Sequence, residues 1–428
     1  MYLCSTLHYV GSSVDCSHKG LSAVPPILNN ITGKKWYIDL SYNNIISIPD
    51  GTLGAISISG LLLQYNKLTS MGDNVFKGNE DTILSLYLHF NNLTEIPTAV
   101  GKLTNMFELS VYGNPIRNLN TETLSGMSES LLTFSFGSSS LQSWPHTLTS
   151  LARASWFNVY GIPLETLPGD AFSDQLYILN ITDSNLKSLS NTLNNKPRFD
   201  ELDLKNIPNL TTEGLSEGGF KNLTKFRTLS IINCSIDTLP HIFDDLIYLG
   251  DVTLTGNPIR DIADDTFPHN FTSMYRLTIS DSLLEKIPVA ITRMTKLMDL
   301  FFTNNRITTI HDTDFHGMTG LYNLHLSGNP LSNISDNAFK SQRELSSLYL
   351  DNTFMTTVPK AIKSIRRLYT LNLDNARVEC SCESLVWMKD LVHDTKRTPN
   401  IVGNCFNTGK PIYDYVINDV PHCQENEI

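Results

Sequence analysis

The sequence predicts an α/β solenoid, in which short turns of chain stack side by side and share one parallel β-sheet on the concave side. Three observations predict it: a repeat of about 24 residues along most of the chain, alternating apolar positions within each repeat, and cysteines placed mainly near the two ends. The chain has 428 residues, of which 41% are hydrophobic, so it can bury a large core.

The repeat appears when segments are aligned without gaps. "LMDLFFTNNRITTI" (297–310) and "LYNLHLSGNPLSNI" (321–334) follow L-x-x-L-x-L-x-x-N-x-L-x-x-I, and "LSSLYLDNTFMTTV" (345–358) follows it with Thr353 at the Asn position. We number the first Leu as position 1. Position 6 then recurs fifteen times, at Leu40, Leu63, Leu88, Val111, Phe136, Val159, Ile181, Leu204, Ile231, Leu254, Ile279, Phe302, Leu326, Leu350 and Leu373.

Alternation around positions 4 and 6 predicts a short strand that points those two side chains inward. One repeat cannot bury its apolar side alone, so neighbouring repeats must stack. The pattern resembles the leucine-rich-repeat family over about residues 21–379. The resemblance implies a curved horseshoe with its parallel sheet on the concave face.

Position 9 is predicted to hold a buried polar ladder, because an amide there can bond backbone groups of adjacent turns. Small polar side chains replace Asn in some repeats, and Ile162, Ile207 and Ala376 cannot take part. The predicted ladder residues are Asn43, Asn66, Asn91, Asn114, Asn257, Asn305, Asn329, Ser139, Ser184, Ser282, Thr353 and Cys234.

A second apolar row is predicted on the outer side of the stack. A Phe or Leu recurs thirteen residues after position 6 in six repeats. These residues are Phe76, Leu124, Phe172, Phe267, Phe315 and Phe339.

Both ends look like caps that close the open stack. "VDCSHKGLSAVP" (14–25) and "VECSCESLVWMKDLV" (378–392) resemble the cysteine-containing caps of extracellular leucine-rich-repeat proteins. We expect a Cys4–Cys16 disulfide, and the resemblance implies the pairs Cys380–Cys405 and Cys382–Cys423. The expected organisation is an N-terminal cap (1–34), repeats (35–379) and a C-terminal cap (380–428).

Cys234 then remains as an expected free thiol, which we interpret as a buried ladder residue. Zinc binding by the four C-terminal cysteines is an alternative, but structural zinc sites favour C-x₂₋₄-C spacing and this chain has C-x-C. The stretch "HDTDFH" (311–316) is the one suggestive metal cluster, and its register favours a solvated turn. Nucleophile, metallohydrolase and phosphate-loop motifs are absent, so no enzyme activity and no cofactor is expected.

Disulfides predict an oxidising compartment, and therefore a secreted protein or the outer part of a surface protein. The sequence shows no secretory signal, and no apolar run is long enough to cross a bilayer. Of eight glycosylation sequons, Asn180 and Asn233 fall on the inner strand face. The six candidate glycosylation sites are Asn30, Asn92, Asn209, Asn222, Asn270 and Asn333.

The concave sheet is the candidate interaction surface, with positions 2, 3, 5, 7 and 8 facing outward. Three basic residues lie there, Lys205, Arg227 and Arg276. Eleven acidic residues share these positions: Asp39, Glu108, Asp183, Asp200, Glu201, Asp203, Asp251, Asp281, Asp299, Asp351 and Asp374. This excess predicts a partner with a basic surface, and the chain's net charge of −11 argues against nucleic acid.

Aromatic residues are unevenly spread over this face. The first seven repeats carry Trp36, Tyr37, Tyr42, Tyr65, Tyr87, Phe90, Phe107, Tyr112, Trp156, Tyr160 and Tyr177, and position 5 of later repeats carries Phe301, His325 and Tyr349. Tyr and Trp are favoured in binding hot spots. The predicted ligand-binding residues are Tyr37, Tyr65, Tyr87, Phe90, Tyr112, Trp156, Tyr160, Phe301, His325, Tyr349, Asp203 and Asp251.

The sequence thus predicts an extracellular recognition module that binds a protein or glycan on the concave face, similar to Toll-like receptor ectodomains or Slit-type domains. An alternative is a structural matrix or adhesion protein that acts by self-association, for example as a homodimer. A third class, an intracellular repeat scaffold, would require reduced cysteines.

Overall fold

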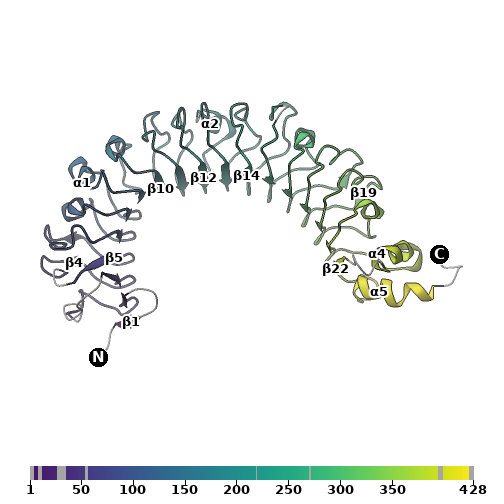
Figure 1. The fold of residues 1–428 in the computed structure, drawn as a ribbon, viewed down its shortest axis with the longest axis horizontal. Helices are drawn as coiled ribbons and strands as arrows, with labels where there is room; N and C mark the ends of the chain where they lie inside the picture. Colours follow the sequence, from purple (N-terminus) through teal and green to yellow (C-terminus); the bar gives the residue numbers. More distant parts are fainter. Residues whose placement is uncertain are drawn as a thin grey trace. The chain divides into compact units, whose positions relative to one another are not determined.

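The computed structural model describes residues 4–7, 12–26, 35–53, 56–217, 219–268, 271–393 and 399–423. The chain divides into two compact units, Met1–Phe226 (unit 1) and Arg227–Ile428 (unit 2). Within each unit the strands of the main sheet line one side of the stack, and irregular turns and short helices line the other (Figure 1).

In unit 1 the sheet runs in chain order, one strand per turn, and neighbouring strands are parallel. Only β1 (Ser5–Leu7) is antiparallel, to β2, among the pairings of the described strands in this unit. The strands are β2 (Ser12–Asp15), β3 (Trp36–Asp39), β5 (Ile58–Leu62), β7 (Ser85–Tyr87), β8 (Glu108–Ser110), β9 (Thr133–Phe136), β10 (Trp156–Tyr160), β11 (Ile178–Thr182) and β12 (Glu201–Lys205). The opposite side carries β4 (Ser47–Ile48), β6 (Ser70–Met71), η2 (Thr98–Lys102), η3 (His146–Ser150), α1 (Thr121–Ser125) and α2 (Thr212–Ser216).

Unit 2 repeats the same arrangement. Its main strands are β13 (Thr228–Ile232), β14 (Asp251–Thr253), β15 (Arg276–Thr278), β16 (Asp299–Phe301), β18 (Asn323–His325), β20 (Ser347–Tyr349), β21 (Thr370–Asn372) and β22 (Asn400–Val402). The remaining elements are β17 (Thr309–Ile310), β19 (Asn333–Ile334), η4 (Val289–Arg293), η5 (Lys360–Ser364), α3 (Cys382–Leu385), η6 (Val386–Met388), α4 (Lys389–His393), α5 (Ile412–Asn418) and η7 (Val420–His422). Among the described residues, no helix is long and apolar enough to cross a membrane.

The core confirms the predicted fold class, a parallel-sheet solenoid of about fifteen turns. All fifteen side chains at position 6 are at most 1% exposed. The outer row is buried as well: Phe315 and Phe339 are 0% exposed and their rings stack at 5.8 Å. Each turn therefore buries its apolar side against the next turn, as the repeat requires.

The polar ladder at position 9 satisfies backbone groups of two adjacent turns. Asn43 accepts hydrogen bonds at Oδ1 from the backbone N–H groups of Lys19 and Leu21, both at 3.0 Å. Its Nδ2 donates to the carbonyl oxygens of Cys16 at 2.9 Å and Leu40 at 3.0 Å. The same exchange recurs at Asn66, Asn91, Asn114 and Asn329.

The prediction for Ser139 is wrong, because Ser139 is exposed and its neighbour Ser138 is buried. In this turn the residue with positive φ is Gly137, at position 7 and with φ of 138°, whereas most other turns place it at position 8. That one-residue shift directs Ser138 inward, where its Oγ accepts a hydrogen bond from Ser140 N at 3.1 Å.

The two ends contribute strands of their own to the sheet. β2 pairs with β3 and β22 pairs with β21, both in parallel, so each end segment continues the stack by one strand. The sulfur atoms are joined as Cys4–Cys16, Cys380–Cys405 and Cys382–Cys423. Helical residues Leu385 and Met388 are 0% exposed, so the C-terminal segment covers apolar surface at the end of the stack.

Replacing Asn43 with Ala should lower the free energy of unfolding by about 2–3 kcal/mol, because several buried backbone groups lose their partner. The matched control is Asn44→Ala, whose exposed side chain lies one residue away and which we expect to stay within about 0.5 kcal/mol of wild type. Urea unfolding followed by circular dichroism measures both. Equal midpoints for the two variants would contradict a structural role for the ladder.

Candidate functional site

The sheet face of unit 1 is rich in tyrosine and poor in charge over its first six turns, residues 36–161. Sheet face here means the side chains at positions 2, 3, 5, 7 and 8. The charged side chains there are Asp39 and Glu108, and both accept hydrogen bonds within the face. Asp39 accepts from Ser41 Oγ at 2.6 Å, and Glu108 accepts from Tyr87 OH at 2.6 Å.

A row of stacked rings runs across four consecutive turns at position 8. We call His18, Tyr42, Tyr65 and Phe90 the left-handed row, because each has a φ between 54° and 57°. Successive ring centroids lie 4.3, 4.3 and 4.6 Å apart, with interplanar angles of 12°, 9° and 23°. Tyr42, Tyr65 and Phe90 remain 45%, 39% and 41% exposed.

A left-handed φ is unusual for aromatic side chains and costs roughly 1–3 kcal/mol per residue. Eleven other turns meet the same backbone requirement with residues that tolerate it, namely Gly113, Gly161, Asp183, Asn206, Asn233, Gly256, Asp281, Asn304, Gly328, Asn352 and Asn375. Ring stacking returns only about 0.5–1.5 kcal/mol per pair. Stability alone therefore gives no reason to place four rings in succession at this position.

A second row of rings lies beside the first, at position 7. His89 stacks on Tyr112 at 4.6 Å, and Tyr112 stacks on Tyr160 at 4.1 Å. Tyr112 and Tyr160 are two turns apart and meet across Gly137, where an added Cβ would lie 1.9 Å from the Tyr160 carbonyl oxygen. The turn between them thus has no side chain at position 7, and its backbone lies close to that of Tyr160.

Burial within this face shifts several pKa values. It lowers the pKa of His89 to about 4, so this imidazole is neutral at physiological pH. It raises the pKa of Tyr112 to about 12, with smaller contributions from Tyr160, Tyr65 and Tyr42. For Tyr87, burial and the hydrogen bond to Glu108 both raise the pKa. His89 is therefore uncharged at physiological pH, and Tyr87 and Tyr112 keep their hydroxyl protons.

The stacking leaves ring edges, and not ring faces, open to solvent. Tyr42, Tyr65 and Tyr112 each have a neighbouring ring stacked on both faces. The open surface is a band of C–H edges and phenol hydroxyl groups that runs along successive turns.

The other predicted residues of unit 1 are more scattered. The Tyr37 ring lies over Gly60, where an added Cβ would be 2.3 Å from it, and Trp156 is 43% exposed at the start of β10. Asp203 lies on β12 and raises the pKa of Tyr160, although burial is the larger cause. Trp36, which the sequence placed on this face, is only 8% exposed and does not present a surface.

In unit 2 the three predicted rings form a short column. Phe301 stacks on His325 at 4.3 Å, and His325 stacks on Tyr349 at 4.0 Å. Burial lowers the pKa of His325, while Asp299 and Asp351 act in the opposite direction. Asp251 does not stand alone, because its Oδ2 lies 3.3 Å from Arg276 Nη1.

The sequence did not single out His18, although a signal was present. "VDCSHKGL" (14–21) aligns with "IDLSYNNI" (38–45), which places His18 in register with Tyr42. Because the sequence assigns this segment to a cap, the residues of its sheet face, including His18, are overlooked. The sequence also overlooked His89, and in unit 2 the exposed side chains Tyr275, Met298 and Tyr322 at position 2.

The remaining site predictions concern modification and metal. Asn92, Asn209, Asn222 and Asn333 are exposed, whereas Asn30 and Asn270 lie outside the described residues. Cys234 is 7% exposed, and its Sγ lies 3.6 Å from the Ile232 carbonyl oxygen.

In "HDTDFH", Asp314 accepts a hydrogen bond from the backbone N–H of His311 at 2.7 Å, and Phe315 is buried. Within the described part of the chain, no three His, Cys, Asp or Glu side chains are grouped closely enough to hold a metal ion.

Comparison with known proteins identifies the repeat. The family model described as "Leucine rich repeat" matches residues 272–331 and 319–378. Comparison with curated protein sequences gives no match.

Solved structures match over most of the chain. A leucine-rich-repeat protein of Leptospira interrogans matches with a TM-score of 0.67 and 20% identity, over 90% of this chain and 94% of that one. A chain of the Drosophila Toll–Spätzle complex, in its glycosylated form, matches with a TM-score of 0.64 and 18% identity, over 89% of this chain and 53% of that one. The plant peptide hormone receptor RGFR1 in complex with RGF2 matches with a TM-score of 0.54 and 20% identity, over 90% and 65%. Likeness at these identities shows the shared fold.

Substitutions at Tyr65 should show how much stability the left-handed φ at this position costs. We expect Tyr65→Gly to be the most stable of the three variants, Tyr65→Asn the next and Tyr65→Ala the least stable. The free energy of unfolding of the Ala variant should lie about 1 kcal/mol below that of the Gly variant, because an alanine keeps the backbone strain and loses the stacking. Differential scanning calorimetry measures the order. An Ala variant at least as stable as the Asn and Gly variants would contradict the argument.

His89 should make the protein less stable in acid. Its folded pKa of about 4 lies below the ordinary histidine pKa of 6.5, so the unfolded chain takes up a proton first as the pH falls through this window. His89→Gln removes that contribution, and its stability should fall less than that of wild type between pH 6.5 and pH 4. Chemical unfolding over this pH range compares the two proteins. Parallel pH profiles would show that His89 is not held neutral.

Proposed function

We propose that this chain, which has the leucine-rich-repeat fold and matches the family model over residues 272–378, is an extracellular recognition module that binds a protein ligand on the sheet face of unit 1. The observation that carries the proposal is the aromatic surface, poor in acidic and basic side chains, formed by the left-handed row and the row His89–Tyr112–Tyr160. The action is noncovalent capture, without a chemical step.

The composition of this face supports a protein-binding surface. Tyr and Trp supply large, rigid contact area at low entropic cost, while Ser, Gly and Asn supply adaptable hydrogen bonds, as in antibody binding loops. The face of turns one to six combines these residue types, including Trp156, Asn158 and Ser135 beside the tyrosines. Stacked rings are already ordered, so binding orders few additional side chains.

The stacking favours a protein over a glycan, the two ligand classes that the sequence left open. The interior rings are covered on both faces, so they offer a sugar ring no open aromatic face on which to pack. They do offer edges and hydroxyl groups, which suit edge-to-face contacts with aromatic side chains and hydrogen bonds to backbone carbonyls. A folded protein supplies both kinds of partner.

An extracellular location is supported by the disulfides near both termini, since such bonds persist in oxidising compartments. Two matched structures are, by their names, a Toll–Spätzle complex and a peptide hormone receptor with its peptide. The proposal also assigns residues 1–34 and 380–428 as caps of the repeats 35–379, with glycans at exposed sequons such as Asn92 and Asn333.

The test is a binding screen of the intact chain against a panel of purified secreted proteins and receptor ectodomains, with a glycan array in parallel. A protein hit should lose at least about 100-fold in affinity in the variant Tyr42→Asn/Tyr65→Asn/Phe90→Asn, because three central contacts are removed while the backbone conformation is retained. Surface plasmon resonance measures the affinity.

The matched control is Tyr248→Ser, which removes an exposed aromatic ring from unit 2 and should leave the affinity unchanged. Glycan hits in place of protein hits would contradict the ligand class. Self-association at micromolar concentration, seen by light scattering and lost in the triple variant, would favour the structural alternative. An unchanged affinity in the triple variant would exclude this face.

A further inference from the structure

Unit 2 has an apolar groove that the proposed function does not use. Tyr275, Met298 and Tyr322 occupy position 2 of three consecutive turns, directly before β15, β16 and β18. They are 45%, 50% and 44% exposed, and they line an open cavity of about 490 Å³ together with Lys296 and Glu344. Tyr369 continues the row two turns further at 70% exposed.

Backbone geometry fixes the groove. The N–H groups of Met298 and Tyr322 donate to the carbonyl oxygens of Tyr275 and Met298, at 2.9 and 2.8 Å, so the three residues lie in register. Gly250 leaves room for the Tyr275 ring, since a Cβ there would lie 2.5 Å from it. The backbone therefore places the three side chains in one row along the sheet, and the Tyr275 ring lies against Gly250.

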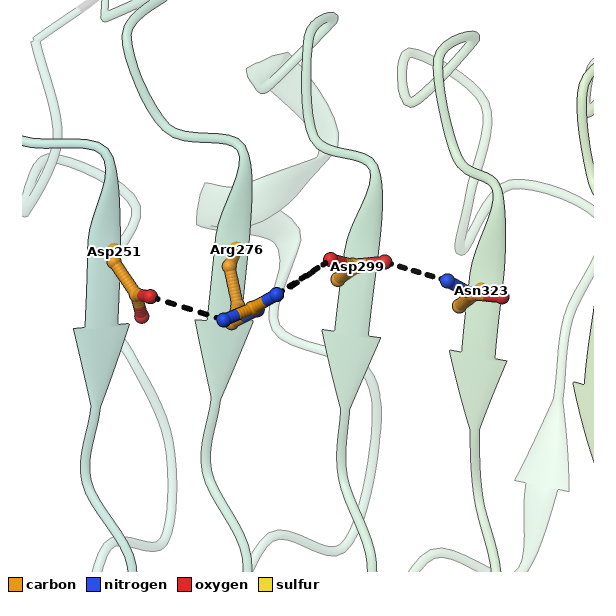
Figure 2. Close-up of polar contacts among 4 residues, drawn as sticks. All are labelled: Asp251, Arg276, Asp299 and Asn323. Atoms are coloured by element: carbon orange, nitrogen blue, oxygen red, sulfur yellow. Dashed lines mark hydrogen bonds and ion pairs between the residues drawn. The ribbon is translucent and has the colours of Figure 1, made fainter. Parts of the chain in front are cut away.

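A line of charged and polar side chains runs beside the groove, at position 3 of each repeat and so one residue after the groove residues. Figure 2 shows Asp251, Arg276, Asp299 and Asn323 on four neighbouring strands. Arg276 Nη2 lies 3.2 Å from Asp299 Oδ2, and Asn323 Nδ2 donates to Asp299 Oδ1 at 2.7 Å. Arg276 thus forms ion pairs with two aspartates, and the four side chains together have a net charge of one negative unit.

The rest of the unit 2 sheet face also carries a net negative charge. Its face positions carry Asp281, Asp351 and Asp374 in addition to that line, and the basic residues among them are Arg227 and Arg276. At short range such a face attracts cations and repels acidic surfaces, and salt screens the effect. A second copy of this chain, with its net charge of −11, is a poor partner for it.

We propose that this groove is a second docking surface, which takes an extended segment of a partner protein carrying Lys or Arg beside apolar side chains. The apolar side chains enter between Tyr275, Met298 and Tyr322, and the cation lies against Asp299 and Asp251. The site is distinct from the aromatic face of unit 1, where both carboxylates, Asp39 and Glu108, accept hydrogen bonds from side chains of that face.

The experiment uses the full chain and three synthetic peptides that share the same Leu and Tyr residues and differ only at alternate positions, which hold Lys, Gln or Glu. Fluorescence anisotropy should show the Lys peptide binding about tenfold more tightly than the Gln peptide, the Glu peptide most weakly, and the preference shrinking as NaCl is raised. Met298→Ser/Tyr322→Ser should weaken all binding tenfold or more.

Variants that remove one charge test whether the carboxylates beside the groove, and not the overall charge of the chain, favour the Lys peptide. Asp299→Asn should lower the Lys peptide's advantage severalfold, whereas Asp245→Asn, which removes an equal charge from an exposed turn of unit 2, should leave it unchanged. The triple ring variant of unit 1 should bind the Lys peptide like wild type, so failure here and failure of the proposed function are distinguishable. Equal binding of the three peptides, or no binding up to about 1 mM, would overturn the proposal.

Discussion

The turn that follows each strand is the constraint on which the rest of the structure depends. In fourteen of the fifteen repeats the chain leaves the strand through a left-handed residue at position 8, and in most repeats it then buries a polar side chain at position 9. The first bends the backbone away from the sheet, and the second bonds to backbone groups of the preceding turn, as Asn43 does to Leu21 and Cys16. Stacking of turns, and with it burial of positions 4 and 6, follows from these two residues.

This constraint also explains why the aromatic row of unit 1 is informative. A side chain at position 8 must accept a conformation that only Gly, Asn and Asp adopt cheaply. Asn304 and Gly328 meet the need in unit 2, whereas Tyr42, Tyr65 and Phe90 meet it with strain that their stacking only partly offsets. A feature that costs stability and leaves apolar edges in solvent is expected where binding supplies the compensating free energy.

The repeat, its core and most of its ladder could be predicted from the sequence because their periodicity is strict. Position 6 is apolar in all fifteen repeats, and Asn66 or Asn329 stands where the ladder needs an amide. Features that depend on one backbone angle could not be predicted. The prediction for Ser139 is wrong because Gly137 moves the left-handed residue by one position, and this turn without a side chain at position 7 lies between Tyr112 and Tyr160. Trp36 and Tyr275 both occupy position 2, yet Trp36 is buried and Tyr275 is exposed. Side-chain burial at the sheet margin is therefore also set by the neighbouring residues and not by periodicity.

The same backbone therefore presents two chemically different faces in its two units. Positions 4 and 6 are committed to the core, whereas position 8 must accept the left-handed φ and positions 2, 3, 5 and 7 vary in side-chain type and burial. In the first six turns of unit 1 these positions hold mainly aromatic and small polar side chains, with Asp39 and Glu108 already bonded. In unit 2 they hold an arginine shared by Asp251 and Asp299 beside an apolar groove. Apolar contact and charge complementarity respond differently to salt, so the salt dependence of binding distinguishes the two faces.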